Sequence, residues 1–75
     1  MEKIKFEFTF PEELKNEPIF YLLVKNFDII PNIIEASFST DTGWAVLTLE
    51  GEEQELKKAI DYLKSRKVSM NILDK

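Results

Sequence analysis

The sequence predicts a single α+β domain in which four antiparallel strands carry two helices on one face, in the order βαββαβ. Three observations predict this class. The first segment alternates apolar and polar residues, two later segments repeat apolar residues at helical spacing, and the remaining apolar runs have strand character. With 75 residues the chain has room for one domain only. We therefore expect residues 1–75 to fold as one unit.

The first strand is predicted over residues 3–10. One face of this segment is polar, and Pro11 ends it because proline has no backbone N–H for a sheet. The opposite face is apolar and consists of Ile4, Phe6, Phe8 and Phe10. This alternation is typical of a strand with one buried and one solvated face.

A helix is predicted next, with Asn16 or Glu17 as its cap, Pro18 in its first turn and its end near Asn26. Its buried face is formed by Ile19, Leu22, Leu23 and Phe27. More apolar side chains lie on its other sides, namely Phe20, Tyr21 and Val24. This helix is therefore either covered by neighbouring loops or has a face that awaits a partner.

A hairpin of two strands is predicted in the middle of the chain. Its first strand covers residues 32–39, and the pattern leaves the inward face of this strand undecided. The polar turn contains Gly43, which can take a positive φ. The returning strand covers residues 44–50, and Ala45, Leu47 and Leu49 should face the core.

The second helix is predicted from Glu52 to Arg66, opened by Gly51. Acidic residues near its start and basic residues at its end suit the helix dipole. One apolar stripe consists of Leu56, Ala59, Ile60 and Leu63. Residues 68–73 alternate again and form the predicted fourth strand.

Right-handed crossovers arrange these strands in the order 4-1-3-2, which is the ferredoxin-like fold. Both helices then cover one face of the sheet. The other face remains open, and it displays Lys3, Lys5, Glu7 and Thr9 beside Trp44, Val46 and Thr48.

The composition excludes most enzyme chemistry. The chain has no cysteine and no histidine, so it lacks thiolates and the commonest metal ligand and general base. Its acidic residues occur in loops and at a helix start, where solvent keeps them ionised. We expect no catalysis, no metal and no cofactor. A net charge of −4 disfavours nucleic acid and anionic lipid surfaces as partners.

The chain shows no secretory signal, and its longest apolar run, residues 19–24, is too short to cross a bilayer. We expect a cytoplasmic protein without membrane insertion. The residues that other functions of this fold require are not found at the matching positions of this sequence. A phosphate-binding loop would need an arginine, and Arg66 lies elsewhere. RNA-stacking positions carry Lys5 and Glu7, and the Cys-x-x-Cys motif of metal-carrying domains is missing.

Three segments carry a resemblance to a known family. They are Glu17-Pro18-Ile19, then Pro31-Asn32-Ile33-Ile34-Glu35-Ala36, then Gly43 to Gly51. In order and spacing they resemble the NIL domain family. That family includes the C-terminal regulatory domain of methionine ABC importer ATPases, where two copies associate and methionine bound between them inhibits transport. The resemblance implies a homodimer, a methionine-like ligand and an ABC importer ATPase as a partner.

The resemblance also implies a site. The signature asparagine of the family falls on Asn32, which would anchor a polar group of the ligand, and Ile33, Ile34 and Phe38 would form an apolar slot. Two positions depart from the family pattern. Trp44 replaces a smaller or polar residue, and Lys67 stands where a glycine is common after the second helix.

An alternative is a ligand-free interaction module that docks a protein through the open sheet face, with Trp44 and Val46 at the interface. Local chemistry alone also allows Asn32 to be a plain turn residue. An amino-acid-binding ACT-type domain shares this topology, and only the Asn32 segment separates the two.

Overall fold

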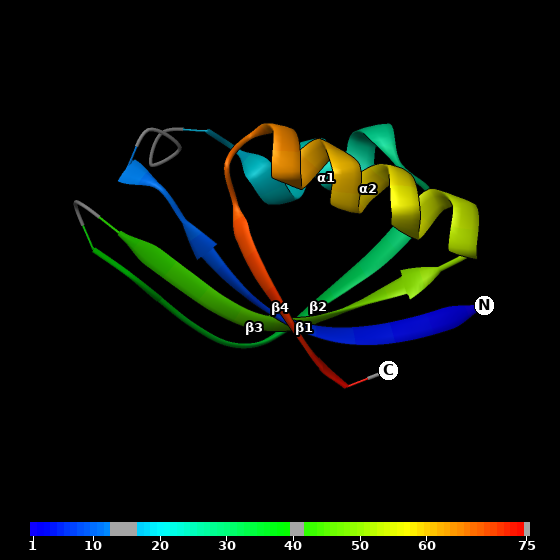
Figure 1. Ribbon diagram of the computed structural model, residues 1–75, viewed down its shortest axis with the longest axis horizontal. Helices are drawn as coiled ribbons and strands as arrows, with labels where there is room; N and C mark the ends of the chain where they lie inside the picture. Colours follow the sequence, from blue (N-terminus) through cyan, green and yellow to red (C-terminus); the bar gives the residue numbers. More distant parts are fainter. Residues whose placement is uncertain (13–16, 40–41, 75) are drawn as a thin grey trace.

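The computed structural model describes residues 1–12, 17–39 and 42–74. It confirms the predicted ferredoxin-like arrangement: one antiparallel sheet has the order β2-β3-β1-β4, which is 4-1-3-2 counted from the other edge. Both helices lie on the same side of this sheet (Figure 1). The elements are β1 (Glu2–Phe10), α1 (Ile19–Asn26), β2 (Ile29–Phe38), β3 (Gly43–Gly51), α2 (Glu53–Ser65) and β4 (Ser69–Asp74).

The core lies between the sheet and the two helices. The inward residues of β1 and β3 are its centre, because these two strands are flanked by strands on both sides. Phe8, Ala45, Leu47 and Leu49 have no exposed surface, as the alternation of both strands predicts. The helices complete the core with Ile19, Leu23, Leu56, Ala59 and Leu63.

The strand β3 includes both glycines of the chain, which the sequence placed in a turn and at the start of a helix. Gly43 does not have a positive φ. A Cβ on Gly43 would lie 2.3 Å from the ring of Phe38, and one on Gly51 would lie 2.9 Å from the carbonyl oxygen of Asp28. Close approach of neighbouring groups, not turn geometry, therefore requires these two glycines.

The edge strand β2 begins at Ile29, three residues before the predicted start, and includes Pro31. An edge position tolerates a proline because one side of the strand has no partner strand. The pairing with β3 shifts between Ile33 and Glu35, which marks a β-bulge. Ile29, Pro31, Ile33, Ala36 and Phe38 pair with inward residues of β3, whereas Ile30, Asn32, Glu35 and Ser37 pair with residues of the open face.

The first helix has no side-chain cap, and Pro18 occupies the cap position. Of the two predicted caps, Asn16 lies outside the described residues, and the carboxylate of Glu17 forms an ion pair with Arg66 at the end of α2. Tyr21 and Val24 are exposed, so the described residues of the neighbouring loops do not cover this side of α1.

The second helix packs its predicted stripe inward, with Leu56, Ala59 and Leu63 buried and Ile60 half-buried. Its first turn is tied to the connection after α1, because Glu55 accepts a hydrogen bond from the backbone N–H of Asp28 at 3.0 Å. Within the described part of the chain, no helix has the length and apolar character needed to span a membrane.

Candidate functional site

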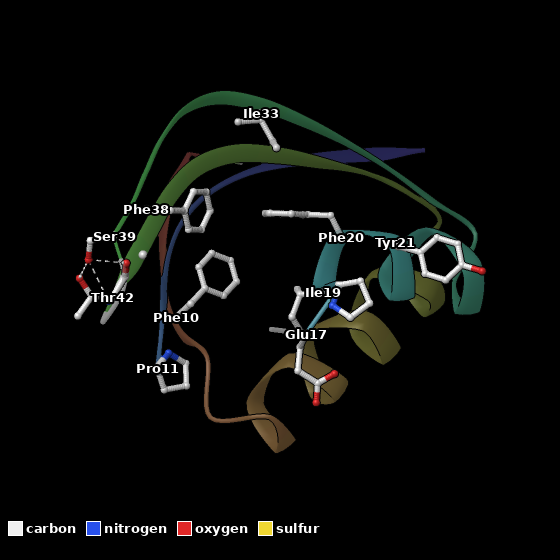
Figure 2. A pocket seen from close by; sticks show the side chains of 12 residues that line it. Phe10, Pro11, Glu17, Ile19, Phe20, Tyr21, Ile33, Phe38, Ser39 and Thr42 are labelled. Carbon is white, nitrogen blue, oxygen red and sulfur yellow. Dashed lines mark hydrogen bonds between the residues drawn. The ribbon is translucent and has the colours of Figure 1, made fainter. Parts of the chain in front are cut away.

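A pocket of about 440 Å³ opens between the end of β1, the start of α1 and the edge strand β2 (Figure 2). These three elements are distant in the sequence. They meet here because β1 and β2 lie on either side of β3, and the start of α1 lies over the inward face of the sheet at this end. The apolar residues that line the pocket include Phe10, Pro11, Pro18, Ile19, Phe20, Ile33 and Phe38. A concave, mostly apolar site of this volume is within the range of small-molecule pockets.

Three phenylalanine rings form the walls. The ring centroid of Phe10 lies 5.8 Å from that of Phe20, in an edge-to-face arrangement, and 5.9 Å from that of Phe38. Figure 2 shows the three rings grouped around the pocket, with Ile33 on its upper side. Rings at these separations and angles attract each other, so the walls have a defined shape.

Phe38 holds its position because it lies over Gly43, its direct partner on β3. The ring occupies the space that any larger residue at position 43 would fill. Phe38 is nevertheless 60% exposed, since β2 has no strand on its outer side. One face of the ring is thus fixed against the sheet, while much of its remaining surface is available for contact.

Polar groups stand at one end of the pocket, where the chain turns from β2 to β3. The Ser39 hydroxyl accepts a hydrogen bond from the backbone N–H of Thr42 at 3.1 Å. The backbone N–H of Ser39 donates to the carbonyl oxygen of Thr42 at 2.8 Å. Both residues line the pocket, and Figure 2 shows their hydroxyl groups at the turn, bonded to each other and away from the phenylalanine rings. The site therefore combines an apolar interior with hydroxyl groups at its rim.

Glu17 is the one carboxylate among the described residues that line the pocket. Its carboxylate points away from the phenylalanine rings (Figure 2) and pairs with the guanidinium of Arg66. The charge of Glu17 is thereby balanced outside the apolar interior. The arrangement favours a ligand whose buried part is uncharged.

The structure brings together two of the four residues that the resemblance assigned to a ligand. Ile33 and Phe38 line the pocket. Asn32 is exposed and pairs with Thr48, so it lies on the open face of β2, opposite to Ile33. Ile34 is the extra residue of the bulge and is 53% exposed. Asn32 and the pocket therefore cannot contact one small ligand together within a single chain.

The two residues expected at an interface, Trp44 and Val46, lie on the open face. Trp44 is 37% exposed and lines a second, shallower hollow together with Glu7, Thr9, Thr42 and Gly43. Val46 is half-buried between Glu7 and Glu35 on the neighbouring strands. Among the described residues, no group of three or more acidic side chains could hold a metal ion.

Sequence reasoning missed Phe10, Phe20, Ser39 and Thr42 as parts of a site. Phe10 was assigned to the core and Phe20 to the surplus apolar surface of the first helix. One signal was present: the predicted topology places the end of β1, the start of α1 and the end of β2 at the same corner, and each carries a phenylalanine. Only the combination of these three positions indicates a pocket.

The fold and the pocket define a ferredoxin-like domain with an apolar pocket between its first helix and its edge strand. The sequence matches the NIL domain family over residues 5–71. The chain therefore belongs to the NIL domain family. No curated protein gave a significant match to the sequence.

Among solved structures, the chain is similar to the C-terminal domain of an ABC transporter ATP-binding protein from Enterococcus faecalis. The TM-score is 0.79 at 23% sequence identity, and the match covers 93% of this chain and 82% of that one. This likeness supports the same fold.

Proposed function

We propose that this chain is a non-catalytic regulatory domain that binds methionine or a related amino acid between two copies and so controls an ABC importer ATPase in the cytoplasm. The observation that carries the proposal is the apolar pocket at the edge strand β2, in a chain that belongs to the NIL domain family. The similar domain from E. faecalis is part of an ABC transporter ATP-binding protein, which is the kind of partner we propose.

The pocket suits an amino acid with an apolar side chain. Its phenylalanine rings offer favourable contacts to a thioether, and the turn with Ser39 and Thr42 supplies the nearest hydroxyl groups for a charged end. Binding such a molecule requires no reacting group. The pocket and the family support a regulatory role, which needs no chemistry from the chain.

The proposed dimer gives Asn32 a place in the same site. Asn32 lies on the face of β2 that the pocket does not use, and β2 is exposed along most of its length. A second copy that packs along β2 would approach both faces of this strand. In the proposed dimer, Asn32 of one copy and the apolar pocket of the other together form one shared site.

Titration calorimetry with L-methionine tests the proposal. We expect heat at submillimolar to millimolar ligand, and we expect Asn32→Ala to weaken binding by about 1.5 to 3 kcal/mol, the value of a hydrogen bond to a charged group. Asn71→Ala is the matched control, since Asn71 is an exposed asparagine on β4, at the opposite edge of the sheet. Absence of heat with methionine and other sulfur amino acids would contradict the proposed sensor function. Unchanged binding in Asn32→Ala would show that Asn32 does not contact the ligand.

A second candidate is a ligand-free module that docks a protein through the open sheet face. Trp44 favours it, because 37% of this large side chain is exposed beside a shallow hollow. In that case Trp44→Ala abolishes association with the ATPase and leaves the circular dichroism spectrum unchanged. Association that persists in Trp44→Ala would exclude this candidate.

A further inference from the structure

The hollow on the open face of the sheet combines an aromatic ring with a carboxylate. Trp44 and Glu7 line this hollow together with Thr9, Thr42 and Gly43. Trp44 belongs to β3, which has a neighbouring strand on both sides, and its side chain is nevertheless 37% exposed. The ring is therefore accessible on the face of the sheet that the helices leave uncovered.

The register of the sheet places a second carboxylate on the other side of this ring. Glu7 on β1 and Glu35 on β2 both lie opposite Val46, which is two residues from Trp44 on the same face of β3. Each of the two acidic residues is thus a diagonal neighbour of Trp44, a separation that aromatic and long side chains can span. The negative face of an indole ring and the adjacent carboxylates both attract a cation.

This part of the open face lacks a compensating positive charge. Within the described part of the chain, Glu7 accepts one hydrogen bond, from the side-chain amide of Asn71 at 3.4 Å, and neither Glu7 nor Glu35 forms an ion pair. The two carboxylates beside Trp44 are therefore complementary to a positive group from outside the chain.

At the opposite end of the open face the charges balance. Lys3 lies opposite Glu50 on β3, and Lys5 lies opposite Asp74 on β4. The lysines of β1 therefore each face an acidic residue on a neighbouring strand. Only the end that carries Trp44 has an excess of negative charge among the described residues of this face.

A guanidinium group fits the hollow better than an ammonium group does. The planar guanidinium stacks on an aromatic ring and donates paired hydrogen bonds to a carboxylate, whereas an ammonium is a compact and strongly hydrated point charge. A second copy of the chain does not supply this group, because the one arginine of the sequence, Arg66, pairs with Glu17 at the end of α2. The occupant is a side chain of a different protein.

We infer that the hollow at Trp44 docks an arginine side chain of a partner protein, stacked on the indole ring and paired with Glu7 and Glu35. This docking rests on the second candidate function, association through the open sheet face, and specifies the group that the partner presents. It requires no ligand in the apolar pocket.

An NMR titration of the full chain with the peptide acetyl-Gly-Arg-Gly-amide tests the inference. The indole N–H signal of Trp44 should shift, and the peptides with lysine or uncharged citrulline in place of arginine should bind at least about threefold more weakly. Thr42 and Gly43 line both the hollow and the apolar pocket, so the indole N–H is the more specific readout.

Glu7→Gln should weaken binding of the arginine peptide by about two- to fivefold, the range of an exposed ion pair. Trp44→Leu, which keeps apolar bulk without the ring, should weaken it by a similar factor, followed through the backbone amide of Thr9. Glu50→Gln is the matched control. It also removes a carboxylate from the open face, but at the end where Lys3 lies opposite, and it should leave binding unchanged.

Two results would overturn the inference: absence of a shift at the indole N–H, or binding of the lysine or citrulline peptide as tightly as the arginine peptide. Equal effects of Glu7→Gln and Glu50→Gln would also overturn it, because binding would then follow net charge and not the hollow. If the arginine peptide does not bind while Trp44→Ala still abolishes association with the ATPase, docking through the open face is retained and its arginine chemistry is overturned.

Discussion

Lys67 adopts a left-handed backbone conformation that is unfavourable for a residue with a Cβ. Its φ of 66° makes it the one described non-glycine residue with positive φ. The position closes α2 in a Schellman motif: the N–H of Val68 bonds to the carbonyl of Leu63 at 3.1 Å, and the N–H of Lys67 bonds to that of Lys64 at 3.0 Å. The resemblance to the NIL family already indicated that a glycine is common at this position.

We expect Lys67→Gly to stabilise the domain by about 0.5 to 1 kcal/mol. A left-handed residue with a Cβ costs about 1 to 2 kcal/mol, and part of this gain is offset because glycine has more freedom in the unfolded chain. Urea unfolding measures the change. Lys64→Gly is the matched control, since the same substitution three residues earlier, inside α2, should destabilise by about 1 kcal/mol. A loss of stability in Lys67→Gly would show that the lysine side chain outweighs the backbone cost.

At the level of elements, the sequence predicted those parts of the fold that depend on local periodicity. The alternation of β1 and the apolar stripe of α2 need no knowledge of the rest of the chain, and Phe8 and Leu63 are fully buried as expected. The bulge in β2 is different. It places an additional residue, Ile34, between two regular stretches and changes which residues face inward, so a strict alternation could not define the inward face.

The candidate site was less predictable because its parts are not neighbours in the sequence. Asn32 and Ile33 are adjacent, yet they lie on opposite faces of β2, so a sequence motif that includes both does not describe one surface. Phe10, Phe20 and Phe38 come from three elements and meet only through the topology. A resemblance to a family can name positions, but it cannot assign them to a face of a strand.

The contact between α2 and the connection after α1 involves a carboxylate whose pKa is lowered. The hydrogen bond from the backbone N–H of Asp28, followed by that from Lys58, lowers the pKa of Glu55 from its ordinary value of 4.5. Because the pKa is lower in the folded state than in the unfolded one, the stabilisation is complete above the unfolded value. It is lost as the pH falls through the folded value.

We expect Glu55→Gln to reduce the loss of stability as the pH falls below the ordinary glutamate value of 4.5, since glutamine has no charge to lose in this range. Urea midpoints at a series of pH values measure the effect. Glu53→Gln, in the same helical turn, is the control, because the N–H of Asp28 is bonded to Glu55. An equal decline with acid in the wild-type protein and in Glu55→Gln would mean that this contact does not contribute to acid sensitivity.

For the whole molecule, the asymmetry between its two sheet edges matters most. The edge strand β2 has ten residues, of which Glu35 is the one charged residue, and Ile30, Ile33, Ile34 and Phe38 are each at least half exposed. The other edge, β4, has six residues and ends with Asp74. Proteins usually protect a sheet edge with charges or by keeping the strand short. Each edge strand has one charged residue and exposed apolar side chains, so β4 is protected by its shorter length, and the longer β2 is better suited to pair with another chain.

We therefore expect the proposed homodimer to form along β2 and Ile34→Lys to prevent it. A lysine at the bulge places a charge in the edge that the second copy would pair with, and Ile34 lines neither the pocket nor the core, so the monomer should keep its fold. Sedimentation measures the association constant, which should fall by at least about tenfold, or about 1.4 kcal/mol. Ile72→Lys makes the same change on β4 and should leave association intact. A dimer that survives Ile34→Lys but not Ile72→Lys would place the interface on the opposite edge, away from the pocket, and ligand binding could then no longer depend on a second copy.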